Sequence, residues 1–175
     1  MDFYDLVGPG FKPDGDLAAR LGYKSVFTAG NELLVIDAGK ESGGHLPYVA
    51  NGNNQGRLAY HAKNGAQGVM PDGFAADASL IETMRDGECI MVIAISQITQ
   101  AGAESRPKML YMAAKLFSAC RKAGINVAFV SMARSRAYLE SYIQMIELAK
   151  LIGADEQYAR YSISRVNGTL GGMHD

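Results

Sequence analysis

The chain has 175 residues, of which 48% are hydrophobic, and its 17 basic and 18 acidic residues leave a net charge of −1. A chain of this size buries one core, so we expect a single domain over residues 1–170 and a flexible tail at 171–175. The lack of an apolar run of about 18 residues and of a basic-then-apolar N-terminus excludes a membrane segment and a signal peptide, which predicts a cytoplasmic protein.

Apolar runs rich in β-branched residues alternate with helix-period runs along the whole chain. Strands are predicted over residues 3–7, 24–29, 32–36, 66–70, 89–96 and 125–131, and helices over 16–23, 56–65, 77–87, 106–123 and 141–153. This order predicts parallel strands joined by crossovers, in an open doubly wound sheet or a closed barrel. Six or seven units of roughly 25 residues favour an α/β fold, a shortened TIM-like parallel barrel in one domain.

Two predicted strands, Cys89–Ile95 and Ile125–Val130, are continuously apolar, so we place them at the centre of the sheet with both faces covered. Cys89 and Cys120 lie in apolar runs, and we interpret them as buried core thiols. The stretch Ala38–Gly56 is rich in Gly and Asn and has no regular period, which predicts a long loop.

The helix predicted over residues 106–123 has one apolar and one basic side. Ser105 is its expected N-cap and Gly124 its end. The basic side holds five residues at helical spacing: Lys108, Tyr111, Lys115, Ser118 and Lys122. Its lysines drift by only about 20° per heptad and so form one ridge. An ordinary solvated helix face is the simpler interpretation of this pattern.

A further helix is predicted to begin at Ser141, because Ser141 and Gln144 fit a capping box, and to end at Gly153. Chemistry in parallel α/β folds lies at the carboxyl ends of the strands. The sequence places these residues there: Asp37, Ser96, Ser131, Arg134 and Arg136. Guanidinium groups and hydroxyls bind phosphate oxygens, so this rim favours contact with an RNA backbone.

The three histidines, His45, His61 and His174, have no metal-ligand spacing, and we expect neither a metal nor another cofactor on this chain. Charge is unevenly divided: residues 1–100 carry 7 basic and 12 acidic residues, whereas residues 101–175 carry 10 and 6. The second part of the chain therefore has the local basic excess that contact with nucleic acid requires.

Several short motifs occur in a fixed order. They read FYDL at residues 3–6, LGY at 21–23, IAIS at 93–96, RPKMLYMAAKLFSACRKAG at 106–124, SMA at 131–133 and YLESYIQMIELAKLIG at 138–153. With this order and spacing the chain resembles the ribonuclease P protein component 3 family of archaea, whose eukaryotic counterpart is the 30-kDa subunit. The likeness covers most of the chain except residues 38–56.

The resemblance implies a degenerate barrel related to the polymerase-and-histidinol-phosphatase (PHP) type of metal hydrolase, with the metal ligands lost. It also implies a subunit that is inactive alone and supports RNA-based endonucleolytic removal of the 5′ leader from precursor tRNA, with Mg²⁺ at the catalytic RNA. The implied partners are ribonuclease P RNA, precursor tRNA, the component 2 protein and other subunits, with no membrane.

We expect the RNA contacts among nine basic residues: Arg57, Arg106, Lys108, Lys115, Lys122, Arg134, Arg136, Arg160 and Arg165. Arg57 and Arg106 rest partly on the resemblance, and the others on charge and placement. Glu140 and Tyr142 stand where the family often has arginine and proline, so no RNA-contacting role is transferred to Glu140.

The contact with the component 2 protein is expected to include Tyr138, Tyr142 or Met145. Two other functions are also consistent with the sequence. One is a stand-alone metal-dependent phosphoesterase with the PHP-like barrel fold, which stoichiometric metal in the purified protein would favour. The other is a protein-only scaffold, which undetectable binding to RNA at low salt would favour.

Overall fold

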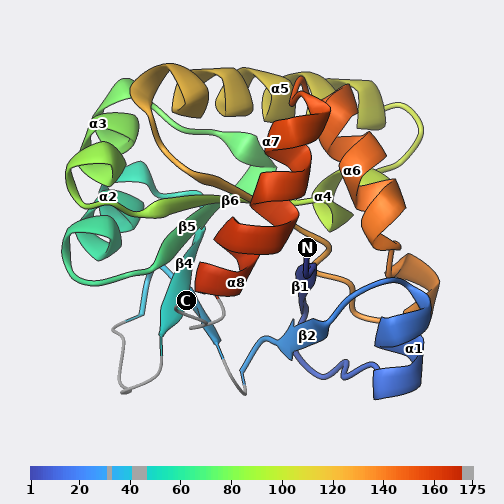
Figure 1. Ribbon diagram of the computed structural model, residues 1–175. Helices are drawn as coiled ribbons and strands as arrows, with labels where there is room; N and C mark the ends of the chain where they lie inside the picture. Colours follow the sequence, from blue (N-terminus) through green and yellow to red (C-terminus); the bar gives the residue numbers. More distant parts are fainter. Residues whose placement is uncertain (31–32, 41–46, 171–175) are drawn as a thin grey trace.

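The computed structural model describes residues 1–30, 33–40 and 47–170, so the tail predicted at 171–175 lies outside the described residues. Seven parallel strands in these ranges form two sheets (Figure 1). One sheet pairs β1 (Tyr4–Val7) with β2 (Ser25–Thr28). The other has five strands in chain order: β3 (Leu34–Asp37), β4 (Tyr48–Gly52), β5 (Gly68–Pro71), β6 (Ile90–Ala94) and β7 (Val127–Val130). The protein is thus a mixed α/β protein with parallel strands, as predicted.

Helices connect the strands and pack outside them. They are α1 (Gly15–Arg20), α2 (Gln55–Lys63), α3 (Ala78–Asp86), α4 (Ser96–Thr99), α5 (Arg106–Ala123), α6 (Tyr142–Leu151), α7 (Glu156–Tyr161) and α8 (Asn167–Leu170). Three short segments complete the set: the 3-10 turns η1 (Asp72–Phe74) and η2 (Arg136–Tyr138), and the π-helical η3 (Ser162–Val166). In Figure 1, α2 and α3 lie side by side, α5 spans the top of the view, and α7 leads into α8 across the strands.

Backbone hydrogen bonds connect the two sheets at both ends. After β2, Ala29 pairs with Leu33 in a parallel bridge just before β3. After β7, the Met132 N–H donates to the Leu6 carbonyl at 2.8 Å, and the Gly8 N–H donates to the Ala133 carbonyl at 2.8 Å. This arrangement is compatible with a barrel-like α/β fold.

The prediction of a long loop over residues 38–56 is wrong, because β4 lies within it. Asn51 and Gly52 at the end of this strand lower its β propensity and obscure the pattern. Tyr48, Val49 and Ala50 are nevertheless buried, since β3 and β5 flank the strand on both edges. Its position in the sheet therefore outweighs its local composition.

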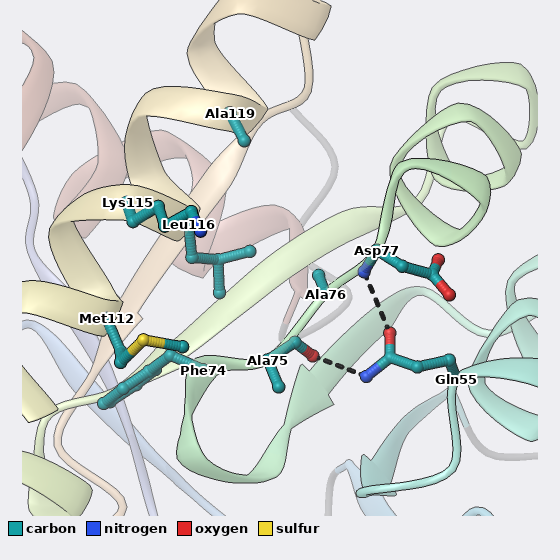
Figure 2. A pocket seen from close by; sticks show the side chains of 9 residues that line it. All are labelled: Gln55, Phe74, Ala75, Ala76, Asp77, Met112, Lys115, Leu116 and Ala119. Carbon is teal, nitrogen blue, oxygen red and sulfur yellow. Dashed lines mark hydrogen bonds between the residues drawn. The ribbon is translucent and has the colours of Figure 1, made fainter.

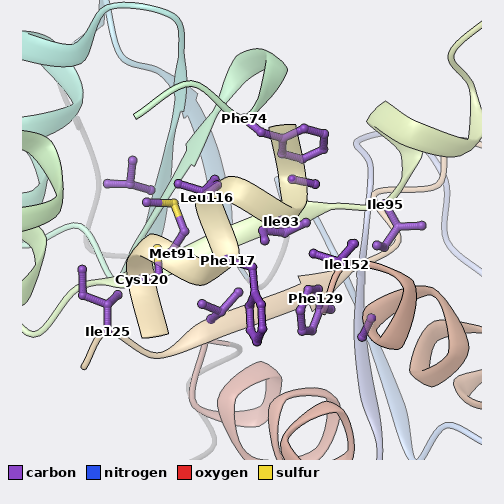
Figure 3. Packing of buried hydrophobic residues seen from close by; sticks show 14 of the residues in the cluster. Phe74, Met91, Ile93, Ile95, Leu116, Phe117, Cys120, Ile125, Phe129 and Ile152 are labelled. Carbon is purple, nitrogen blue, oxygen red and sulfur yellow. The ribbon is translucent and has the colours of Figure 1, made fainter. Parts of the chain in front are cut away.

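The hydrophobic core has two layers, one on each face of the strands. Between the five-stranded sheet and the helices, Met91 and Ile93 of β6 pack with Leu116 and Phe117 of α5 (Figure 3). The opposite layer includes Ile90, Val92 and Ala94 of the same strand, and Val166 and Leu170 at the C-terminal helical segment close it. All residues of β6 and of β7 are buried, which confirms the prediction of two strands covered on both faces. β7 is the last strand of the five-stranded sheet, however, so its predicted place at the centre of the sheet is wrong.

The ends of the two best-predicted helices match the sequence signals. α5 occupies Arg106–Ala123, and Gly124 follows it with φ = 74°, a left-handed conformation that glycine adopts without strain. Ser105 is the N-cap residue, as predicted, but its hydroxyl donates to the Gly102 carbonyl and makes no hydrogen bond to the helix backbone. The capping box of Ser141 and Gln144 at the start of α6 is confirmed.

The outer edge of β7 is covered by polar side chains. The Tyr158 hydroxyl accepts from the Val127 N–H at 2.9 Å, and the Ser162 hydroxyl accepts from the Phe129 N–H at 3.2 Å. The Asp5 carboxylate accepts from the Ser131 N–H at 2.7 Å. These bonds satisfy alternate buried N–H groups that would otherwise be left unpaired.

Asn167 links β7 to β1 from the same helical segment. Its side-chain amide donates to the carbonyls of Phe129 at 2.8 Å and Tyr4 at 2.9 Å. Ser162 lies four residues after Tyr158, but Asn167 lies five residues after Ser162. The π-helical segment η3 absorbs this extra residue, which keeps all three polar side chains on the face toward β7. We call Asp5, Tyr158, Ser162 and Asn167 the β7 seam.

Candidate nucleic-acid interface

The predicted basic side of α5 is exposed along its whole length. Lys108, Tyr111, Lys115, Ser118 and Lys122, which we call the α5 stripe, are all exposed. Tyr111 is 67% exposed, so its ring is accessible to solvent. The opposite side of the helix is buried through Ala113, Leu116, Phe117 and Cys120. The helix therefore has its buried apolar residues on one face and its exposed polar residues on the other.

The stripe lysines have no acidic partner in the described part of the chain. Over residues 1–30, 33–40 and 47–170, ion pairs join acidic groups to Lys24, Arg85, Lys150 and Arg160, and none of these pairs includes a stripe lysine. Exposed ammonium groups without a protein partner keep their attraction for an external anion. The stripe is thus free to contact a polyanion.

A pocket of about 360 Å³ opens beside the stripe, between α5 and the loop that follows η1 (Figure 2). Phe74, Met112 and Leu116 provide large apolar groups in its lining, and Lys115 contributes from the stripe. We call this cavity the α5 pocket. No local sequence pattern predicts this pocket, because its lining comes from three separate segments of the chain.

Gln55 holds the loop side of this pocket in place. Its amide nitrogen donates to the Ala75 carbonyl at 2.7 Å, and its amide oxygen accepts from the Asp77 N–H at 3.2 Å. Asp77 in turn caps α3, because its carboxylate accepts from the Leu80 N–H at 2.8 Å. The loop is therefore tied to both α2 and α3.

A second hollow of about 390 Å³ lies on the other flank of α5, near the end of α6. Its lining includes Ala114, Ser118 and Arg121. The Arg121 guanidinium lies 4.0 Å from the centre of the Tyr158 ring, so this cation is already engaged within the protein. Ser118 belongs both to the stripe and to the lining of this hollow.

The arginines predicted at the strand-end rim are exposed. Arg134 and Arg136 lie in the segment after β7, and Arg57 lies in the first turn of α2, directly after β4. The stem of Arg134 packs close to Gly8, where an added Cβ would lie 2.8 Å from its Cγ. Gly8 thus leaves room for this arginine at the end of β1.

Acidic groups also lie at the strand ends, so this rim has mixed charge. Asp37 ends β3, and Asp72 follows β5. Partial burial raises the pKa of Asp72, and the negative charge of Asp37 raises it further. The rim as a whole is therefore less suited to phosphate than the α5 stripe is.

Ser131 is buried, and its hydroxyl is used inside the protein. It donates to the Leu6 carbonyl at 3.4 Å and accepts from the Ala133 N–H at 3.3 Å. The prediction that this serine belongs to a phosphate-contacting rim is wrong. Ser96, at the start of α4, is only partly buried.

Three of the other predicted RNA-binding residues are exposed or partly exposed but lie apart from the stripe. The Arg106 guanidinium donates to the carbonyls of Thr99 at 3.3 Å and Ala101 at 3.2 Å, which fixes the loop before α5. Arg160 pairs with Glu156 at 2.8 Å on α7, and Arg165 is exposed on η3. The nine predicted residues thus belong to several surfaces, and α5 carries the longest continuous one.

The predicted contact surface for the component 2 protein needs correction. Met145 is fully buried, and the Tyr142 ring stacks on Phe3 with 4.3 Å between the ring centres. Both side chains therefore stabilise the packing of α6 against the N-terminus. Tyr138, at 48% exposure, is the one of the three that faces solvent.

The two cysteines and one of the histidines are buried. Cys89 and Cys120 are free and buried, and burial raises the pKa of each thiol to about 12, which confirms their interpretation as core residues.

His61 is buried beside Tyr48 and the Ala38 carbonyl, whereas His45 and His174 lie outside the described residues. The described residues contain no group of three or more His, Cys, Asp or Glu side chains that could hold a metal.

Solved structures share part of this fold. A prolidase complexed with N-methylphosphonate-L-proline aligns over 74% of this chain and 34% of its own, with a TM-score of 0.56 and 14% identity. The A. niger ochratoxinase aligns over 71% and 30%, with a TM-score of 0.52 and 17% identity. A Xaa-Pro dipeptidase with methionine bound in its active site aligns over 73% and 34%, with a TM-score of 0.53 and 13% identity.

The chain spans about a third of the length of these proteins, and at such identities the likeness concerns the fold alone. No protein-family model and no curated protein matches the sequence. Among the described residues, no helix is long and apolar enough to cross a membrane.

Proposed function

We propose that this chain is an RNA-binding subunit of ribonuclease P that supports removal of the 5′ leader from precursor tRNA and is not catalytic alone. The α5 stripe is the observation that carries the proposal. Its lysines repeat every seven residues on an exposed face, and an exposed tyrosine lies between the first two. Lysines contact phosphates without reading sequence, and an aromatic ring stacks on unpaired bases.

A shortened barrel of the PHP-related type is the fold that we propose for this subunit. The hydrogen bonds that connect the two sheets at both ends support a closed ring of seven strands. The apolar layer of Leu6, Phe27, Val49 and Val130 supports a filled interior, with Leu170 at its amino end. Such a barrel presents its outer helices, including α5, as binding surfaces.

The same proposal includes the partners that the sequence resemblance implies. Catalysis would belong to the ribonuclease P RNA with its Mg²⁺, and the component 2 protein would bind beside this chain. Tyr138 is our candidate for that protein contact, since it is exposed on η2. Cleavage of precursor tRNA by particles reconstituted with and without this chain tests its role as a subunit.

Replacing Lys108, Lys115 and Lys122 together by alanine should weaken binding to ribonuclease P RNA. Each phosphate contact contributes about 0.7 to 0.9 to the slope of log affinity against log salt, so three lost contacts should reduce the slope by about 2. At moderate salt the affinity should fall by about 10-fold or more, with little change in sequence preference. Fluorescence anisotropy over a salt series measures both quantities.

A second variant controls for net charge. Lys12, Lys40 and Lys63 are exposed and lie outside α5, so their replacement by alanine removes the same charge from other surfaces. This control should keep a slope close to that of the parent. Equal salt slopes for the parent and the folded stripe variant would contradict the proposed RNA face.

A metal-dependent hydrolase, the class to which a stand-alone phosphoesterase belongs, is the second candidate function, and the identity of the structural neighbours favours it. They name a prolidase, an ochratoxinase and a Xaa-Pro dipeptidase. Under our proposal the purified chain should hydrolyse neither an Xaa-Pro dipeptide nor a phosphodiester, with or without added Zn²⁺ or Mn²⁺. Turnover that persists through further purification and is lost with a chelator would favour the hydrolase.

A further inference from the structure

We propose that the α5 pocket binds one unstacked nucleobase of an RNA strand that lies along the α5 stripe. This inference rests on the proposed RNA-binding function and names the chemical group that the site takes. Its support comes from the shape of the pocket, the fixed loop beside it and the charges at its mouth.

The pocket has the size and lining of a site for one flat ring system. Its volume of about 360 Å³ lies near the lower end of the range for small-ligand sites. Apolar surface for the faces of a base comes from Met112 and from three alanines, Ala75, Ala76 and Ala119, whose short side chains leave the space open. Phe74 and Leu116 also line the pocket but are almost fully buried. A helix or strand of a partner would not fit such a cavity.

The loop beside the pocket is held in position without a ligand. Phe74 has φ = 59°, a left-handed conformation that residues other than glycine rarely adopt, and its side chain is buried. The preceding Gly73 N–H donates to the Gln97 side chain at 2.8 Å, and Gln55 fixes Ala75 and Asp77. A site that is already ordered loses little conformational entropy when a ligand binds.

One polar group in the lining of the pocket, Lys115, can bond the edge of a base. The Gln55 amide is occupied on both its donor and acceptor sides, so it serves the loop. The Asp77 carboxylate caps α3 and points away from the pocket, so it too serves the protein (Figure 2). The Lys115 ammonium remains as a donor, and bases present acceptor atoms along one edge that it can bond.

The lysines on either side of the pocket distinguish a nucleobase from a protein side chain. Lys108 and Lys122 lie seven residues before and after Lys115, which separates them from it by about 10 Å along the helix. A strand that places a base in the pocket would therefore have phosphates near a lysine in both directions. An apolar side chain of a protein partner would gain nothing from these charges.

The test uses the full-length protein and a short single-stranded RNA with 2-aminopurine, a fluorescent adenine analogue, at one central position. A matched RNA lacks the base at that position. The parent protein should bind the base-containing RNA about 10-fold more tightly than the abasic one, since stacking of a single base has an effect of this order. The fluorescence should rise on binding as the analogue leaves its neighbours in the strand.

Two variants of α5 locate the effect. Ala119→Leu places a larger side chain in the α5 pocket and should abolish the preference for the base-containing RNA. Ala114→Leu makes the same change in the hollow on the other flank of the helix and should retain the preference. Circular dichroism and thermal unfolding check that both variants fold.

The outcomes separate this inference from the function on which it rests. If the triple lysine variant binds RNA as the parent does, the proposed function fails. If that variant binds weakly but the parent binds abasic and base-containing RNA equally, the pocket assignment alone is overturned, and a protein side chain becomes its occupant. Loss of the base preference in Ala114→Leu instead of Ala119→Leu would also overturn it.

Discussion

Titration of Asp5 should lower the free energy of unfolding by about 3 kcal/mol as the pH rises, and replacing Asp5 by asparagine should remove this change. Asp5 is fully buried, and this burial raises the pKa of its carboxyl from 3.8 to about 6, against the lowering effect of its bonds with Ser131 and Leu6. One carboxylate oxygen has no hydrogen-bond partner in the described structure. The charged form of Asp5 is therefore unfavourable in the folded state.

The direction of this pH dependence follows from the pKa of Asp5 in the unfolded and in the folded state. Below the unfolded pKa of 3.8, Asp5 is protonated in both states and folding incurs no penalty from its charge. As the pH rises toward about 6, the unfolded chain loses this proton first, so the folded state becomes less stable. Above that pH both states are ionised, and the penalty is constant.

Urea unfolding at a series of pH values measures this contribution. The parent should lose stability relative to Asp5→Asn between about pH 4 and pH 7, and the difference between the two proteins should then level off. Partial burial also raises the pKa of Glu140, so Glu140→Gln serves as a control with a smaller expected change. Parallel curves for the parent and Asp5→Asn would mean that Asp5 is ionised without cost.

Replacing Asn167 by alanine should destabilise the protein by about 3 kcal/mol. The Asn167 amide donates to the Phe129 and Tyr4 carbonyls, and the residue is only 2% exposed. Without these donors both carbonyls lose a partner that water does not readily replace. Amide hydrogen exchange should also accelerate in β1, because Asn167 ties this strand to β7.

A nearby threonine provides the matched control. The exposed Thr169 hydroxyl donates to the Arg165 carbonyl within its own helical segment. Thr169→Ala should therefore change the free energy of unfolding by less than about 0.5 kcal/mol. If Asn167→Ala costs no more than this control, the β7 seam does not depend on its side chain.

The α5 stripe could be predicted from the sequence, whereas the α5 pocket beside it could not. The α5 stripe depends on the spacing of residues within one helix, which a linear sequence displays directly. The pocket depends on Gln55, the loop at Phe74 and the middle of α5, which are far apart in the chain. Composition gave no signal for it, because alanine and methionine are ordinary core residues.

The sequence by itself determined the alternation of strands and helices, the buried β6 and β7, the ends of α5 and the capping box of α6. These features follow from local periodicity and from turn residues, and both act over a few neighbouring positions. The exposed lysines of α5 and the buried cysteines belong to the same class, since an amphipathic pattern decides which side of an element is covered.

The tertiary structure alone decided that β4 exists, that Ser131 is buried and that Met145 is unavailable to a partner. It also decided that Asp5 and Asn167 form hydrogen bonds with backbone groups along the edge of β7. Each of these outcomes depends on contacts between residues distant in sequence, such as Asp5 with Ser131. A polar group can be buried at a small cost in free energy only when its hydrogen-bond partner is in place, and no local sequence pattern identifies that partner.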